Sequence, residues 1–405
     1  MKKSCTLIIV FLSFFCHSQK KVAAINSIKL DEKREISIYL PPSYEKNKEK
    51  KYPLLLLMDG HYLFDAFTGA LTYGIYWDDL PEMIIVGINQ STSDQRERDV
   101  TISPEDGLPI EKGAKFYDFL TTELLPGIQK EYRIAPFRII AGHEITGSYI
   151  NLFLYNNKPL FNAYIALSPE LDETMEERVT EQLLKMKSPV FYYQSVADGD
   201  LKTTQSAVAA LDTNIKTITN TNLFYKLDSF KNTSHYAAVL YAIPNALYHL
   251  FSIYPPISTS EYKEKIVTLK SDYTDYLSKK YDIIQNTYGI KIPIRLNDFK
   301  AIEAAIIKNE DFNELEKLAQ LANKNYPKAM LGEYYVALYY EKKGDIKRAA
   351  KSYQTAYTME PIGDLTKDEM ITKAESFKSK LKKDKKNNKV TEETEPAPET
   401  PTEKQ

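Results

Sequence analysis

Continuous apolar runs alternate with helix-periodic segments along the first two thirds of the chain. Such runs predict strands buried on both faces of a sheet, because those strands need apolar side chains at successive positions. The alternating segment 36–40 predicts an earlier, half-exposed strand, and helical spacing marks 116–128. The runs that predict further strands are 52–58, 83–88, 137–141, 163–167, 190–194 and 222–227. Strands separated by helices indicate an α/β protein with a mainly parallel, doubly wound sheet.

The strand pattern largely ends after Pro255-Pro256. Residues 260–285 predict one helix, and a short link over 288–294 follows it. Two proline steps, Tyr326-Pro327 and Glu360-Pro361, then stand one tetratricopeptide period apart. The second repeat fits that motif and the first fits it poorly, so two ordinary helical hairpins remain the alternative. The positions that fit are Ala337, Tyr340, Ala349, Tyr353 and Ala356.

The N-terminus has the composition of an export signal. Met1-Lys2-Lys3 precedes the apolar run 7–15, and small residues stand at −3 and −1 if cleavage follows Ser18. The run is too short for a bilayer span, which needs about 20 residues, so no transmembrane span is expected. A lipid anchor on Cys16 is the alternative, and the bulky Phe14-Phe15 count against it. We expect an exported protein, periplasmic or extracellular.

These patterns divide the chain into five expected segments. The last is too polar to offset its chain entropy by burial. The segments are 1–18, a signal peptide; 19–255, the α/β domain; 256–295, a helix and linker; 296–377, tetratricopeptide-like helical repeats; and 378–405, a disordered Lys-rich and then Glu/Pro-rich tail.

Composition and charge exclude several functions. The net charge of −2 gives no electrostatic reason to bind nucleic acid. Both cysteines precede the expected cleavage point, which excludes a disulfide framework and a cysteine zinc site in the mature chain. The sequence has no His-x-x-x-His motif and no glycine-rich phosphate loop, so we expect neither a metal nor a cofactor.

The candidate chemistry lies where the strand 137–141 runs into Gly142-His143-Glu144-Ile145-Thr146-Gly147. In α/β-hydrolases the nucleophile occupies a sharp turn of this kind between a strand and a helix. The small flanking residues allow the backbone segments of the turn to approach each other closely.

Several further segments carry a family resemblance. The region from about residue 25 to residue 252 resembles the esterase D type of α/β-hydrolase, which includes the enterochelin (siderophore) esterases. The resemblance implies an α/β-hydrolase fold and a small ester or siderophore-like ligand. The 288–293 link and the repeat resemble secreted bacterial members that carry a helical tail. The matching segments are 40–44, 52–60, 84–88, Arg98-Asp99 and 161–169.

The resemblance also assigns site residues. Glu144 stands where the family has its serine nucleophile, and His235 matches the catalytic histidine. Asp198 or Asp200 matches the triad acid, and the sequence does not decide between them. Oxyanion donors would be the N–H groups of Ile145 and of a residue near Gly60 or His61, with His143 alongside. We expect Ser148, one turn further on, to lie on a helix surface.

Three functional hypotheses follow from Glu144. The first is a catalytically impaired homologue that binds a ligand or partner, with Glu144 ion-paired to His235. The second is an active carboxylic ester hydrolase that uses Glu144 and His235 without a serine, either through a carboxylate nucleophile or through water attack. The third is an interaction scaffold whose protein partner binds the helical repeats.

Overall fold

The computed structural model describes residues 20–91, 93–156 and 158–392. The chain divides into two compact units. The first, called the sheet unit, runs to Tyr254 and includes Thr287–Ile290. The second, called the helical unit, comprises Pro255–Asn286 and the residues from Lys291 onward. The expected signal peptide lies outside the described residues.

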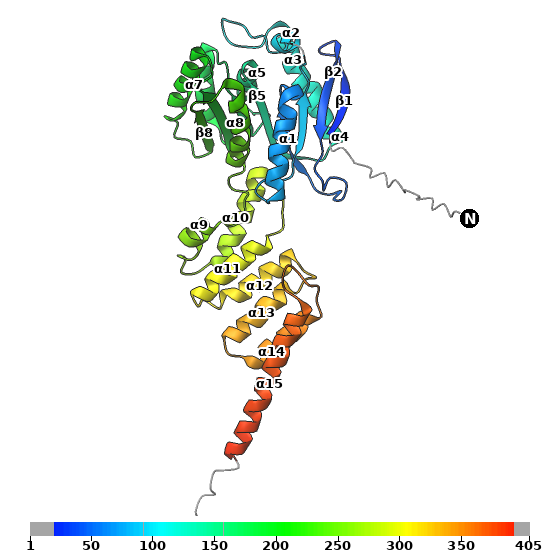
Figure 1. Cartoon of the computed structure of the whole chain (residues 1–405), viewed down its shortest axis with the longest axis vertical. Helices are drawn as coiled ribbons and strands as arrows, with labels where there is room; N and C mark the ends of the chain where they lie inside the picture. Colours follow the sequence, from blue (N-terminus) through cyan, green and yellow to red (C-terminus); the bar gives the residue numbers. More distant parts are fainter. Residues whose placement is uncertain (1–19, 92, 157, 393–405) are drawn as a thin grey trace, which may run out of the picture. The chain divides into compact units, whose positions relative to one another are not determined.

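An eight-stranded sheet forms the centre of the sheet unit (Figure 1). Its order is β1-β2-β4-β3-β5-β6-β7-β8. β1 and β2 pair antiparallel, as do β2 and β4, and the other neighbours are parallel. The strands are β1 (Lys20–Ser27), β2 (Glu32–Tyr39), β3 (Tyr52–Leu57), β4 (Ile84–Ile88), β5 (Ile134–His143), β6 (Ala163–Leu167), β7 (Val190–Ala197) and β8 (Leu223–Phe230).

Helices cover both faces of this sheet, which explains why its central strands are apolar at every position. All of β3, β4 and β6 is buried. α1 and α8 contact each other and pack against the sheet, while side chains from α3, α6 and α7 join Leu54 and Leu56 of β3 in a separate core cluster. The helical segments are α1 (Gly60–Tyr76), α2 (Ser93–Asp99), α3 (Glu111–Asp118), η1 (Phe119–Leu124), α4 (Leu125–Glu131), α5 (Ile145–Tyr149), η2 (Ile150–Leu154), α6 (Glu173–Lys185), α7 (Lys202–Ile215) and α8 (His235–Leu250).

The helical unit has its own apolar core. Phe299, Leu318 and Tyr335 are fully buried within it. Its elements are α9 (Thr259–Glu261), η3 (Tyr262–Ile266), α10 (Tyr273–Tyr288, of which the last two residues belong to the sheet unit), α11 (Leu296–Lys308), α12 (Glu314–Asn325), α13 (Leu331–Lys342), α14 (Ile346–Tyr357) and α15 (Lys367–Glu392).

The predicted fold class is confirmed, and individual elements differ from expectation. The predicted single helix over 260–285 is wrong, because the chain leaves the helix between Ile266 and Tyr273. β1 was not predicted, and its side chains are largely exposed, so it lacks an apolar pattern. α15 continues past residue 378, where the sequence analysis expects a tail. No helix among the described residues is long and apolar enough to cross a membrane.

Candidate active site

The segment after β5 forms a strained turn with Glu144 at its apex. Glu144 has φ 53° and ψ −121°, and α5 begins at the next residue. A Cβ on Gly142 would lie 2.6 Å from the Thr146 carbonyl carbon. Only glycine therefore fits where the strand and the helix approach each other. This is the geometry of a nucleophile elbow, with a carboxylate in place of a hydroxyl.

The ends of three parallel strands bring a histidine and two carboxylates together. His235, the first residue of α8, follows β8, and Asp200 follows β7. His235 Nε2 lies 2.7 Å from Glu144 Oε1, and His235 Nδ1 lies 2.6 Å from Asp200 Oδ1. The three side chains contact one another in the order nucleophile position, histidine and acid. They meet because the carboxyl ends of parallel strands share one edge of the sheet.

Asp200, and not Asp198, contacts His235. The Asp200 carboxylate is buried and also accepts a hydrogen bond from the Ala197 N–H. Asp198 is half-exposed and pairs with Lys231 and the Asn232 N–H. The two aspartates point differently because Gly199 between them packs tightly against the loop before His235. A Cβ on Gly199 would lie 2.6 Å from the His235 backbone nitrogen.

Arg96 and Asp59 are two site residues that the sequence analysis missed. Arg96 Nη1 donates to Glu144 Oε2 at 3.0 Å, and Arg96 Nε donates to Asp59 Oδ1 at 2.7 Å. Asp59 is buried at the end of β3, where it also accepts hydrogen bonds from Thr146 and Tyr62. The alternating charges around Arg96 predict a solvated loop. That prediction is wrong, because Arg96 lies in α2 and its partners lie just after β3 and β5.

The charges stabilise one another. Burial raises the pKa of Glu144, but His143, His235 and Arg96 outweigh it, so the pKa lies below that of an ordinary glutamate. Burial lowers the pKa of His235, but hydrogen bonds to Asp200 and Glu144 outweigh it, and the net pKa is raised. Both directions favour the charged pair, carboxylate on Glu144 and imidazolium on His235.

His143 lies behind this pair and is only 1% exposed. Its Nδ1 lies 2.9 Å from the Tyr62 hydroxyl, and its ring centroid is 4.8 Å from that of His235. Burial lowers the pKa of His143 to about 4, so the ring is neutral at pH 7. Its Nε2 is buried and has no hydrogen-bond partner among the described residues.

The expected oxyanion donors lie at the starts of two helices. Ile145 is the first residue of α5, and Gly60 and His61 are the first two residues of α1. The first N–H groups of a helix have no intrahelical acceptor, so these groups are free to bind a carbonyl oxygen. Both helices start at the carboxyl edge of the sheet, after β5 and β3.

Ser148 differs from expectation. It is 4% exposed and not on a helix surface. Its hydroxyl lies 3.1 Å from Met175 Sδ. It therefore points into the core of the sheet unit and does not replace the missing serine.

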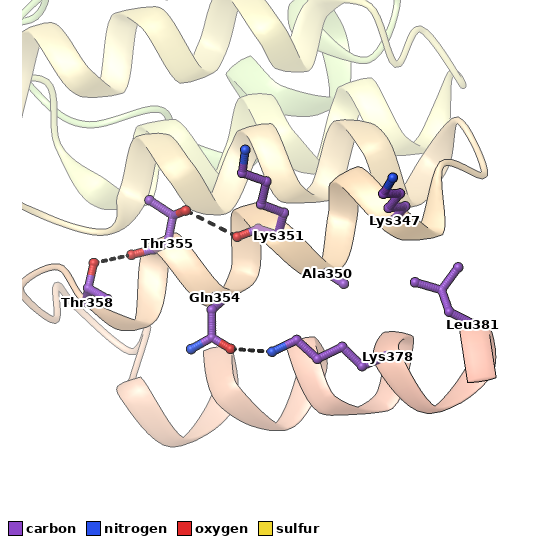
Figure 2. A pocket seen from close by; sticks show the side chains of 8 residues that line it. All are labelled: Lys347, Ala350, Lys351, Gln354, Thr355, Thr358, Lys378 and Leu381. Carbon is purple, nitrogen blue, oxygen red and sulfur yellow. Dashed lines mark hydrogen bonds between the residues drawn. The ribbon is translucent and has the colours of Figure 1, made fainter.

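The helical unit contains a separate hollow of about 560 Å³ between α14 and α15 (Figure 2). Lysine, threonine and glutamine side chains line it, and Lys378 Nζ donates to Gln354 Oε1 at 2.6 Å. Among the lining residues there is no carboxylate, histidine or cysteine. This hollow lacks the groups for acid–base or nucleophilic chemistry, so the candidate active site is the cluster around Glu144.

Comparison with known families agrees with this geometry. Residues 27–239 match the model of the family described as "Putative esterase". The chain belongs to this esterase family. The match spans the strands and loops that position Glu144, Asp200 and His235, and it confirms the resemblance drawn from the sequence.

Solved structures extend the comparison. An uncharacterised protein from Capnocytophaga ochracea is 31% identical with a TM-score of 0.81, and covers 89% of this chain and all of its own. That coverage reaches beyond the esterase match into the helical unit. The IroE-like serine hydrolase from Shewanella oneidensis is 20% identical with a TM-score of 0.57, covering 75% of this chain and 98% of its own. The latter likeness shows the fold. No curated protein matches the chain.

Proposed function

We propose that this esterase homologue does not cleave esters by the serine route and instead binds a small ester or siderophore-like ligand without cutting it. The observation that carries the proposal is the position of the Glu144 carboxylate. It lies at the elbow, with one oxygen on His235 and the other on Arg96.

The serine route needs a hydroxyl whose proton passes to a histidine base. Glu144 offers no hydroxyl, and its side chain fills the space between His235 and the elbow. That is the space in which a tetrahedral intermediate would form. Ser148, whose hydroxyl contacts Met175 Sδ, cannot take over without movement of the turn.

The site holds groups suited to binding a ligand, which supports the proposal. The N–H groups at the starts of α1 and α5 face the same edge as the relay. Tyr62 and Tyr236 are exposed beside His143 and His235, so their rings can contact an apolar or aromatic part of a ligand. These features support binding after loss of hydrolysis.

Hydrolysis without a serine is the second candidate, and the retained contact between Asp200 and His235 favours it. Glu144 would act as a carboxylate nucleophile, or Glu144 or His235 would activate water. Glutamate is one methylene longer than the aspartate that α/β-hydrolases with carboxylate nucleophiles use. A displacement of about 1 Å can cost about 100-fold in rate, so binding remains the preferred proposal.

We further propose that the protein is exported and that its helical unit binds a protein partner. The N-terminal pattern supports export. The exposed hollow between α14 and α15 supports a partner site, since it lies on repeat-like helices and carries three lysines.

An ester assay tests the main proposal. The purified full chain, assayed with short-chain p-nitrophenyl esters in the presence of EDTA, should match the uncatalysed rate. Glu144→Ser should restore a nucleophile and raise the rate. Adding His235→Ala to it should remove at least about 100-fold of that gain, because the base is lost. Ser148→Ala is the matched control and should leave the activity of Glu144→Ser unchanged.

Two outcomes would overturn the proposal. One is strong parent activity that His235→Ala abolishes. The other is labelling of the parent by a fluorophosphonate probe, which would identify another serine as nucleophile.

A further inference from the structure

Three side chains of the site place possible metal-ligand atoms close together. His143, Glu144 and His235 each offer a ligand atom within 4.8 Å of the other two. Glu144 and His235 contact each other, whereas His143 Nε2 is buried and has no hydrogen-bond partner within the described part of the chain. A buried nitrogen left unpaired destabilises the fold, so an absent partner is expected at this position.

The hydrogen bonds around His143 fix which ring nitrogen is free. Tyr62 has one hydroxyl proton, and its oxygen lies 3.1 Å from the carboxylate of Asp59, which can only accept. The Tyr62 oxygen must therefore accept from the His143 Nδ1–H at 2.9 Å. In the neutral ring this leaves an unprotonated Nε2, whose lone pair is available to a metal ion.

His235 is held in the same way. Its Nδ1 faces the buried carboxylate of Asp200, so Nε2 is directed at Glu144. A carboxylate on the far nitrogen of a histidine is the usual outer support of a zinc ligand, because it orients the ring and makes it more basic. Both histidines thus have an oxygen partner on Nδ1, which leaves Nε2 as the nitrogen that would bind an ion.

The surrounding charge suits a divalent cation. The carboxylates of Asp59 and Glu144 pair with the guanidinium of Arg96, and the carboxylate of Asp200 pairs with His235. Once an ion displaces the proton of His235, the three carboxylates and Arg96 together carry two net negative charges. Arg96 binds Glu144 Oε2, so Oε1, which contacts His235 Nε2, is the oxygen that would become a ligand.

We propose that His143, Glu144 and His235 form a binding site for a divalent transition-metal ion, with Zn²⁺ as the best match. Two imidazoles and one carboxylate are a common ligand set for zinc sites that keep a fourth position open. The ion would replace the proton that His235 and Glu144 share in the metal-free protein. The site goes beyond the proposed function, because it does not depend on whether any ester is cut.

The ligand atoms need only side-chain movement to close on an ion. Zinc–ligand bonds of about 2.0–2.1 Å place tetrahedral ligands about 3.3 Å apart. The present distance between the ligand atoms is at most 4.8 Å, which exceeds the tetrahedral spacing by about 1.5 Å. The cluster lies beside the exposed Tyr236, so the fourth position would be open to water or to an anionic ligand.

Metal titration of the full chain tests the site. After dialysis against EDTA, ZnCl₂ titrated by calorimetry should bind as one ion per chain with a Kd of about 1 μM or tighter. CoCl₂ should give the visible absorption of a tetrahedral complex, and zinc should raise the Tm of the parent. His143→Ala should weaken zinc binding at least about 100-fold, and Asp200→Asn about 10–100-fold through loss of the outer support.

His61→Ala is the matched control, because it removes an imidazole that is not among the three ligands and leaves the His61 backbone N–H in place. It should bind zinc as the parent does. Circular dichroism and the metal-free Tm show whether each variant folds. If His143→Ala does not fold, Glu144→Gln, which keeps the side-chain shape, gives the second measurement of zinc binding.

Three results would overturn the proposal: no one-to-one binding tighter than about 0.1 mM, binding that both His143→Ala and Glu144→Gln leave intact, or binding that His61→Ala abolishes. Ester hydrolysis that the parent shows only when loaded with zinc would overturn the proposed function and support the metal site. Zinc binding without hydrolysis supports both.

Discussion

Arg34 shows how much one enclosed charge depends on its partner. Its side chain and that of Asp99 are fully buried, and Arg34 Nη1 donates to Asp99 Oδ2 at 2.6 Å. Gln90 Nε2 donates to the same carboxylate at 2.9 Å, while Gln90 Oε1 accepts from the Asp59 N–H. The pair is thereby linked to the backbone that carries Asp59 into the site.

Removal of Asp99 should therefore be costly. Asp99→Ala leaves the Arg34 charge buried with its main partner gone, and should lower the free energy of unfolding by about 3–5 kcal/mol. Asp94→Ala, which breaks the exposed pair with Arg98 on the same short helix, should change it by less than about 0.5 kcal/mol. Urea unfolding of both variants measures the difference, and equal effects would contradict the burial argument.

At the scale of elements, the start of α1 depends on contact between two backbones. A Cβ on Gly60 would lie 2.6 Å from the Gly87 carbonyl carbon in β4. A Cβ on Gly87 would in turn meet the Phe64 ring of α1. The contact between α1 and β4 therefore has one glycine from the helix and one from the strand. This close approach sets the position of Asp59, Gly60 and His61 at the edge of the site.

Two glycines of α1 should respond oppositely to the same change. Gly60→Ala should destabilise the sheet unit by about 1–3 kcal/mol, because neither backbone can move aside freely. Gly69→Ala should stabilise it by about 0.5–1 kcal/mol, since Gly69 is exposed in the helix interior with nothing within 4 Å of an added Cβ. Thermal and urea unfolding compare them, and a stable Gly60→Ala protein would show that the approach is not required.

At the scale of the whole molecule, the sheet unit is not a continuous stretch of chain. Thr287–Ile290 belong to it, although they follow 32 residues of the helical unit. Tyr288 is fully buried and its ring centroid lies 5.0 Å from those of Phe137 and Phe251. Its hydroxyl donates to the Leu250 carbonyl at 2.9 Å. The core of the sheet unit is thus completed by a tyrosine that follows the last strand in the sequence.

Tyr288→Ala should accordingly lower the stability of the sheet unit by about 3–5 kcal/mol through the cavity that it leaves. Ile283→Ala, on the exposed side of the same helix, is the control and should have little effect. Hydrogen exchange of the β5 and β7 amides, next to Phe137 and Phe191, measures the change. Unaltered exchange in Tyr288→Ala would show that the unit is complete without this residue.

The sequence pattern predicted most of the strands and a candidate site. Alternation over 36–40 identified β2. Apolar runs identified β3 to β8, because a strand covered on both faces needs apolar residues at each position. β1 was missed since it lies at the sheet edge, with mostly exposed side chains. The glycines around Glu144 identified the elbow, because close backbone approach restricts which residues fit there.

Which side chains of the candidate site contact one another depends on the tertiary structure. Asp198 and Asp200 are equivalent in sequence, and only the packing of Gly199 against the His235 loop directs Asp200 to the histidine. Arg96 has the local pattern of a solvated charge, yet its partners Asp59 and Glu144 lie just after the ends of β3 and β5. His143 and His235 are 92 positions apart with no metal-binding spacing, and they face each other because β5 and β8 end at the same edge of the sheet. Local sequence fixes the periodicity of each element, whereas contacts between strand ends depend on the order of strands in the folded sheet.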